Sequence, residues 1–278
     1  MKKTNRALIG FAIAGVAAKY TISAVKRWRQ SRDATADGWL RENHRGEVVS
    51  LDEGPALTAG LVVGTALSTK SLRNSASYTI AISGAGSFGL VDDLAETGSA
   101  KGIRGHLVAL ARGELTTGGI KILGIGLSSL TAVAISLKPH ERTVRNVLTA
   151  GALVAGTANL GNLLDLRPGR VLKATSFPSL GLSLSSAIET GPPGAILGAS
   201  FAVAADDLSE HTMAGDSGAN ALGAALGMSF VSNFSPRTRE ALLAVVVLLT
   251  LASEKWSFSK VIDSTPALHK IDCWGRRR

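Results

Sequence analysis

Apolar residues recur along the chain from Ala7 to Ser253 in runs that are separated by short polar and charged segments. A predominantly apolar run of about 20 residues is what a helix needs to cross the hydrocarbon core of a bilayer. Nine runs can be distinguished, near residues 7–25, 55–69, 77–91, 118–137, 146–164, 171–188, 191–205, 217–234 and 241–253. The pattern predicts an all-α, polytopic membrane bundle with about nine transmembrane segments, formed by residues 1–278 as a single domain.

The runs are rich in small residues, as in GGIKILGIGLSS and GANALGAALG. Small residues let helix backbones approach closely inside a bilayer, where lipid removes the usual hydrophobic drive for helix association. Several runs are shorter than about 20 residues, so we expect some helices to extend into neighbouring polar residues or to be re-entrant.

The first run leaves two alternatives open. Lys2, Lys3 and Arg6 precede LIGFAIAGVAA, which is the order of charged and apolar residues in a cleavable signal peptide. The apolar run continues through YTISAV into the basic cluster KRWRQSR, and this favours a retained membrane anchor.

Composition supports a membrane protein over a nucleic-acid-binding one. Only 18% of the 278 residues are charged, whereas about a quarter is usual in soluble domains. The net charge of +9 comes from short clusters beside apolar runs, such as KRWRQSR and the terminal Arg276, Arg277 and Arg278, and such clusters more often orient a membrane protein. Nucleic acid is therefore not an expected partner. The single cysteine, Cys273, excludes an internal disulfide and a zinc site built from cysteines.

Lysine and arginine are distributed unevenly between the two sides of the predicted bundle. With nine spans and the N-terminus outside, the segments that face the cytosol hold eighteen of these residues and the opposite segments hold ten. Because cytosolic loops carry an excess of Lys and Arg, the count favours an outside N-terminus and a cytosolic C-terminus. The basic N-terminus itself points the other way.

Acidic and amide side chains lie at the ends of four predicted spans. A carboxylate beside hydrocarbon is costly and usually persists only where it has a partner or a task. The four places are Asp92 and Asp93 in SFGLVDDL, Asn159, Asn162 and Asp165 in ANLGNLLD, Asp206 and Asp207, and Asp216 in MAGDSGAN. In the nine-span arrangement all four lie on the cytosolic side, although that side was assigned from Lys and Arg alone. The sequence predicts one acidic site there; the alternative is that these residues are solvated span ends.

Several carboxylates that converge near basic residues suit Mg²⁺, which takes oxygen ligands and is typically shared with substrate phosphates. Lys101, Arg104 and Arg112 follow the Asp pair in the next loop. They could hold phosphate oxygens, or they could only orient the loop. We therefore expect Mg²⁺ as the cofactor of this site.

Four motifs in order along the chain resemble the polyprenyl-phosphate N-acetylhexosamine-1-phosphate transferase family: DD at a span end, KGIRGH in the next loop, NLGNLLD and MAGDSGANALG. The family includes phospho-N-acetylmuramoyl-pentapeptide transferase and undecaprenyl-phosphate GlcNAc-1-phosphate transferase, and the likeness covers most of the chain. It implies a multi-pass enzyme of the bacterial cytoplasmic membrane, with its active face in the cytosol. It also implies a Mg²⁺-dependent reaction for cell-envelope glycan synthesis. The phosphate of a polyprenyl phosphate attacks the sugar-linked phosphorus of a UDP-sugar, and UMP is released.

The resemblance also implies residue roles. Asp92, Asp93 and Lys101 correspond to the catalytic acidic pair and the loop lysine that serves the phosphates. Asp93 and Asp216 are the expected metal ligands. The expected substrate-binding residues are Asn159, Asn162, Asp165, Arg167 and Arg170.

This chain departs from the family where DLRPG replaces DGLDG, so that Arg167 and Arg170 frame a Pro-Gly turn, and where His269 stands alone without a histidine cluster. Three functions thus stay open. The first is a divergent transferase, with a homodimer as one expected arrangement. The second is a non-catalytic homologue that binds lipid or has a structural role. The third is a transporter, which is disfavoured because its acids should lie near the membrane midplane.

A GxGxxG sequence at 84–89 lacks the acid that a dinucleotide site needs about twenty residues later.

Overall fold

The computed structural model describes residues 3–31, 38–95, 116–185 and 189–277. In these segments a long helix coincides with each of the nine apolar runs. The long helices are α1 (Lys3–Ser31), α2 (Glu53–Ser68), α3 (Leu72–Ala95), α5 (Thr117–Ser136), α6 (Val144–Leu164), α7 (Arg170–Leu184), α8 (Gly191–Leu208), α9 (Gly215–Asn233) and α10 (Pro236–Ser253). The short elements are strands β1 (Leu40–Glu42) and β2 (Val48–Ser50), the 3-10 helix η2 (Pro139–Glu141), α11 (Phe258–Ser264) and α12 (Pro266–Cys273). The all-α fold class is confirmed.

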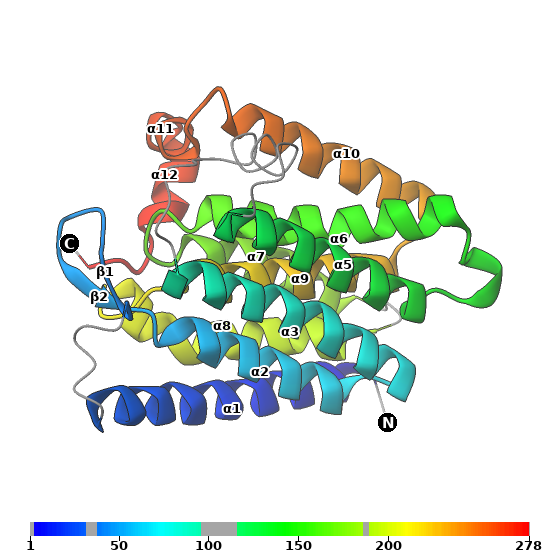
Figure 1. Ribbon diagram of the computed structural model, residues 1–278, viewed down its shortest axis with the longest axis horizontal. Coiled ribbons are helices and arrows are strands. Elements are labelled where there is room, and N and C mark those ends of the chain that lie inside the picture. Colours follow the sequence, from blue (N-terminus) through cyan, green and yellow to red (C-terminus); the bar gives the residue numbers. More distant parts are fainter. Residues whose placement is uncertain (1–2, 32–37, 96–115, 186–188, 278) are drawn as a thin grey trace.

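The long helices lie side by side and give the molecule two ends (Figure 1). The antiparallel β1–β2 hairpin, α12 and the C-terminus gather at one end, and the N-terminus lies at the other. We call the first the hairpin end. The last turn of α3, the first turn of α9, the end of α6 and the start of α7 all lie at the hairpin end, because the helices alternate in direction.

Only some of these helices are long and apolar enough to cross a membrane. Among the described residues, α1, α5 and α6 are long and apolar enough, and α10 with α11 passes as a pair bent by 94°. The expectation of about nine spans is not confirmed: by length and composition, the described residues contain three candidate spans, or four if the bent pair is one span. Helices α2 and α7 have 16 and 15 residues, so each extends only about 24 Å along its axis, against a hydrocarbon core of about 30 Å.

Helix α9 forms the centre of the bundle. Fifteen of its nineteen residues are buried, and it contacts α2, α3 and α6 along its length. Ten of these fifteen buried residues are Gly, Ala or Ser, which allow the helices to pack closely. A Cβ on Gly198 of α8 would lie 2.0 Å from the backbone oxygen of Phe11, so α1 and α8 also meet backbone to backbone.

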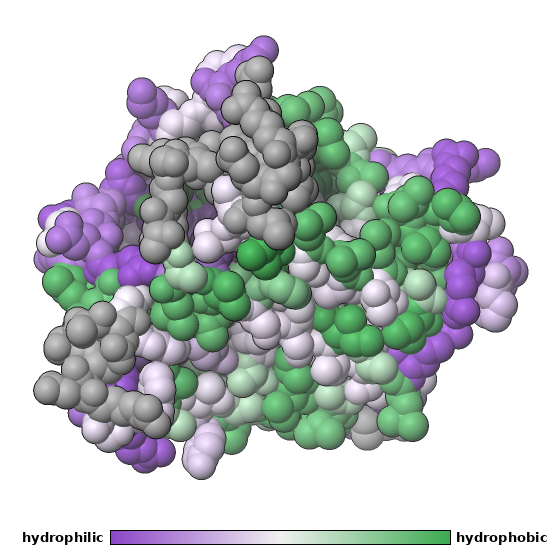
Figure 2. All heavy atoms as spheres, in the orientation of Figure 1, coloured by the Kyte–Doolittle hydropathy of each residue, from purple (hydrophilic) through white to green (hydrophobic). Residues whose placement is uncertain are grey.

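Other large apolar side chains lie on the outer surface of the bundle. Leu67 of α2, Leu184 of α7 and Phe201 of α8 are 65%, 76% and 74% exposed. Figure 2 shows that apolar residues gather over the middle of the helices and hydrophilic residues gather toward the two ends. Close helix packing through small residues, together with large apolar side chains on the outer surface, is typical of a bundle that is surrounded by lipid.

Candidate functional site

A lysine lies between two carboxylates at the hairpin end. Asp92 is in the last turn of α3, Asp216 is in the first turn of α9, and Lys121 of α5 forms ion pairs with both. Their side chains are 12%, 26% and 17% exposed, so the cluster is partly shielded from water. Because each carboxylate offers an oxygen to the same ammonium group, the three residues form a site where negative charge converges on one cation.

Asp93 has a different task from its neighbour. Its Oδ1 accepts a hydrogen bond from the backbone N–H of Asp216 and its Oδ2 accepts one from Ser217, each at 2.9 Å. A carboxylate in this position satisfies the otherwise free N–H groups of a helix N-terminus and interacts favourably with the helix dipole. The guanidinium of Arg41 donates to the backbone oxygen of Asp93 from the β1 strand. Asp93 therefore fixes α9 against α3 and so fixes the position of Asp216.

The close approach of α3 to α9 depends on a glycine. A Cβ on Gly89 would lie 2.4 Å from the backbone oxygen of Asp216. The sequence GAGSFG, which ends at Gly89, thus lies within a helix and serves packing.

A second acidic group lies beside the cluster. Asp165 caps the end of α6, and its Oδ2 is buried without a hydrogen-bond partner among the described residues. Burial, and then the negative charges of Asp207, Asp216 and Asp93, raise the pKa of Asp165 well above its usual range. Asp207 of α8 accepts a hydrogen bond of 2.7 Å from the N–H of Gly169, which holds the Pro-Gly turn in place. Acids from four separate stretches of sequence thus lie together at the hairpin end. Asp206, the neighbour of Asp207 in α8, instead has an exposed side chain and lies 4.0 Å from Lys19.

The two arginines of the DLRPG turn separate in the structure. Arg170 is buried and forms a bidentate pair with Asp272 of α12, at 2.9 and 3.0 Å, and donates to Ser259 at 2.9 Å. It is therefore used within the protein and is not free to bind substrate. The side chain of Arg167 makes no hydrogen bond or ion pair within the described part of the chain, and it lines two cavities.

Three hollows are lined by residues of this region, and the third includes Lys121 of the cluster. A cavity of 330 Å³ is lined by Asp165, Asp207, Arg167 and His44, and a larger one of 970 Å³ shares Arg167 and His44 with it. Burial, and then the charge of Arg167, lower the pKa of His44. The third hollow is apolar, has a volume of 300 Å³ and opens between α5, α6 and α10; we call it the α5–α10 groove. Its polar lining residues include Lys121, Asn159 and Asn220.

The carboxylates suit a divalent cation only in part. Within the described residues, no three His, Cys, Asp or Glu side chains are grouped closely enough to hold a metal ion. Mg²⁺ is, however, often bound through one or two carboxylates, with water and substrate phosphates completing the coordination. Asp92 and Asp216 already converge on a cation and could supply these two oxygens. The expected pair of Asp93 and Asp216 fits less well, because both carboxylate oxygens of Asp93 accept backbone hydrogen bonds.

Three other expected residues remain. Asn159 lines the α5–α10 groove, Asn162 lies within the last turn of α6, and Lys101 is outside the described residues. Two important residues escaped prediction. Lys121 is a single charge inside an apolar run, and this is itself the signal that could have identified it, because such a charge is costly without a partner. Glu53 at the start of α2 is fully buried and accepts a 2.7 Å hydrogen bond from Thr212, and nothing in its local sequence distinguishes it.

No protein-family model and no curated protein matches this chain. The chemistry of the site is thus judged from its own residues. Two carboxylates share a lysine that lines an apolar groove, and the Arg167 side chain lines two polar cavities. Such an arrangement can bind phosphate groups, neutralise their charge and admit an apolar chain from the side.

Proposed function

We propose that the chain is a membrane transferase that moves a sugar-1-phosphate from a UDP-sugar to a polyprenyl phosphate and releases UMP. In this reaction an oxygen of the lipid phosphate forms a bond to the sugar-linked phosphorus, and the bond from that phosphorus to UMP breaks. The observation that carries the proposal is that Lys121, which pairs with Asp92 and Asp216, lines the α5–α10 groove, while Arg167 lines two polar cavities. A lipid phosphate that arrives with its chain in this groove would meet Lys121 first.

The cationic residues would bind phosphate groups, and the carboxylates would bind the metal ion. Lys121 would bind the anionic oxygens of the lipid phosphate, and Arg167 would bind the pyrophosphate of the nucleotide in the adjacent cavity. Mg²⁺ held by Asp92 and Asp216 would neutralise charge on the phosphates. Asp93 would act as a positioning residue through α9. Phosphoryl transfer needs mainly positioning and charge stabilisation, and these groups supply both.

The proposal includes a location. We infer that all nine long helices lie in the bacterial cytoplasmic membrane, with the hairpin end in the cytosol, where UDP-sugars are available. The outward apolar side chains of α2, α7 and α8 support this for helices that are too short or polar to qualify by composition. Short helices can cross a bilayer that thins locally around them.

The direct test is UMP release by the purified protein with undecaprenyl phosphate, Mg²⁺ and a panel of UDP-sugars. Asp92→Asn and Asp216→Asn should each lower turnover by roughly a thousandfold, because each removes several kcal/mol of charge stabilisation in the transition state. Asp206→Asn is the matched control, since Asp206 is exposed and only weakly paired with Lys19. Wild-type protein that releases no UMP from any UDP-sugar would refute the catalytic assignment.

A second candidate is a non-catalytic homologue that binds polyprenyl phosphate. One observation favours it: Lys121 already provides the cation between Asp92 and Asp216, so the site is neutralised without a metal. In that case undecaprenyl phosphate would bind with equal affinity with and without Mg²⁺, and no UMP would form.

A further inference from the structure

A second apolar groove, of 620 Å³, lies between α1, α7 and α8; we call it the α1–α8 groove. Its walls include Phe11, Leu180 and Phe201, which are exposed at the surface of the bundle, and the rings of Phe11 and Phe201 lie 5.9 Å apart. None of its lining residues belongs to the α5–α10 groove. In a membrane this groove would be filled by hydrocarbon.

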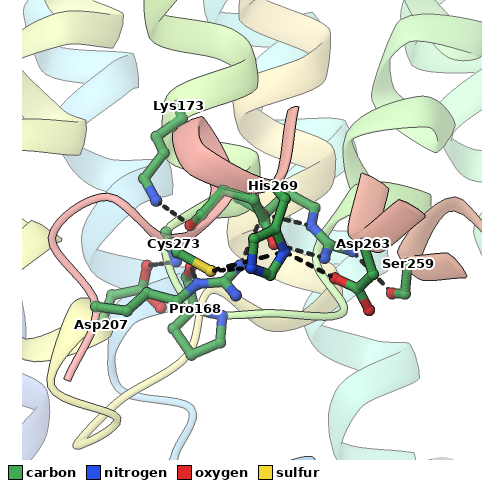
Figure 3. Close-up of polar contacts among 11 residues, drawn as sticks. Pro168, Lys173, Asp207, Ser259, Asp263, His269 and Cys273 are labelled. Carbon is green, nitrogen blue, oxygen red and sulfur yellow. Dashed lines mark hydrogen bonds and ion pairs between the residues drawn. The ribbon is translucent and has the colours of Figure 1, made fainter. Parts of the chain in front are cut away.

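A basic cavity adjoins one end of the α1–α8 groove. Phe177, Trp274 and Gly275 line both hollows. Five lining side chains of the 970 Å³ cavity are Lys or Arg and only two are acidic. Lys173 lines the groove and donates one hydrogen bond of 2.7 Å to the backbone oxygen of Asp272, as Figure 3 shows. An ammonium group has three donors, so Lys173 can also bind an anion. The pair of hollows therefore matches a molecule with an apolar chain and a negative head.

A buried hydroxyl in the groove indicates that this molecule carries a hydrogen-bond acceptor. Ser200 of α8 is 4% exposed and lines the groove, and its Oγ has no hydrogen-bond partner within the described chain. A buried donor without a partner is costly, so a ligand that accepts a hydrogen bond here would be favoured. Ser200 lies eight residues, or about two helical turns, before Leu208 at the hairpin end. A glycerophospholipid carries ester carbonyls between its phosphate and its chains, whereas a polyprenyl phosphate has no acceptor below its phosphate.

We propose that the α1–α8 groove binds an anionic glycerophospholipid of the surrounding membrane. One acyl chain lies in the groove, an ester carbonyl accepts a hydrogen bond from Ser200, and the phosphate lies at Lys173 beside the basic cavity. This site rests on the membrane location within the proposed function but not on the transfer reaction. The lipid would stabilise the contact between α7 and the C-terminal segment.

The test is native mass spectrometry of the full chain in detergent, with phosphatidylglycerol, phosphatidylcholine or undecaprenyl phosphate added separately. The wild-type protein should retain phosphatidylglycerol in preference to phosphatidylcholine. Ser200→Ala should weaken its retention about fivefold, and Lys173→Gln about tenfold or more, as expected for a neutral and a charged hydrogen bond. Ser129→Ala is the matched control, because its hydroxyl is also buried and unpartnered but lies outside the groove.

Two results would overturn the site. One is phosphatidylglycerol retention that neither Ser200→Ala nor Lys173→Gln changes. The other is stronger retention of undecaprenyl phosphate, lowered by Lys173→Gln but not by Ser200→Ala, which would make the groove a carrier site. Because the readout is lipid mass and not UMP, its failure and a failure of the transferase proposal can be told apart.

Discussion

At the scale of single residues, Lys121 determines the charge balance at the hairpin end. Replacing it with Met leaves Asp92 and Asp216 facing each other without a cation. Removing one partner of a buried ion pair costs about 3 kcal/mol of unfolding free energy, and we expect a loss of this size for Lys121→Met. Added Mg²⁺ should restore much of the loss, because a divalent ion can take the vacated position. Thermal unfolding in detergent, with and without Mg²⁺, measures both effects.

Lys19→Met provides the comparison for Lys121→Met, since Lys19 is exposed and 4.0 Å from Asp206. It should change stability by less than about 1 kcal/mol and show no response to Mg²⁺. An equal Mg²⁺ effect in both variants would mean that the ion acts on the protein surface and not between the two carboxylates.

The acidic residues at helix ends could be predicted from sequence, whereas their partners could not. Asp92, Asp165 and Asp216 were identifiable because charges beside apolar runs are rare. Hydropathy marks Lys121 as a charge inside an apolar run, but it does not show which side of α5 faces α3, so the partners of Lys121 could not be predicted. Arg170 was expected to bind an anionic ligand, but its anion is Asp272, about a hundred residues later. Such a distant pairing cannot be inferred from spacing.

At the scale of elements, the C-terminal helix α12 is held by the pair between Arg170 and Asp272, whose side chains are 5% and 4% exposed. Asp272→Asn leaves the Arg170 guanidinium buried without its counterion, at a cost of about 3 kcal/mol. If the cost lowers the free energy of undocking α12 and not that of global unfolding, the undocked population of α12 should rise on the order of 100-fold. Limited trypsin cleavage after Lys270 at neutral pH measures the release. Asp263→Asn, at an exposed carboxyl, should leave the cleavage rate unchanged.

The same pair gives the docking of α12 a pH dependence. Burial acts to raise the pKa of Asp272, but the hydrogen bond and charge of Arg170, followed by the charge of Arg276, hold this pKa below its usual value. A carboxyl with a lower pKa in the folded state stabilises the fold above its unfolded-state pKa, and this contribution is lost as the pH falls through the folded-state pKa. The wild-type segment should thus stay docked from neutral pH to below about pH 4. Trp274 fluorescence that changes between pH 7 and pH 5 would contradict this.

The contact between α1 and α8 can be tested by adding one methyl group. In Gly198→Ala the new Cβ would lie 2.0 Å from the backbone oxygen of Phe11, so the two helices must separate. We expect a loss of about 1–3 kcal/mol, as is usual for overpacking. Gly181→Ala in α7 has open space around it and should instead stabilise the protein by about 0.5–1 kcal/mol. Equal effects of the two variants on thermal unfolding would show that α1 and α8 are not in close contact.

Hydropathy located the long helices well but not the short elements. The nine runs fall within or beside the nine long helices, because these helices carry apolar residues over most of their length, on the faces toward the core and on the outer faces. The helix α12 and the β1–β2 hairpin contain mixed polar sequences and are held by specific contacts, such as the pair between Arg277 and Glu47. Apolar patterning carries no information about such contacts.

At the scale of the whole molecule, the number and direction of the long helices predict the membrane topology. An odd number of membrane crossings places the two termini on opposite sides, and the long helices of the described chain number nine. The hairpin end and the opposite end are both polar, so either could face the cytosol on hydropathy alone. The excess of Lys and Arg at the hairpin end decides the orientation that we propose.

The chain carries its own probe for this orientation, because its single cysteine, Cys273, is exposed at the hairpin end. If that end is cytosolic, a membrane-impermeant maleimide should not label Cys273 in intact cells but should label it in inverted membrane vesicles. The matched variant combines Cys273→Ser with His140→Cys, in the exposed turn between α5 and α6 at the opposite end, and should be labelled in intact cells. An orientation with the hairpin end outside would reverse both results. Labelling of both positions from the same side would be incompatible with a bundle that spans the bilayer, since the two cysteines lie at opposite ends of the helices. Because a UDP-sugar and the carboxylates must share one compartment for transfer to occur, labelling of Cys273 in intact cells would also argue against the transferase proposal.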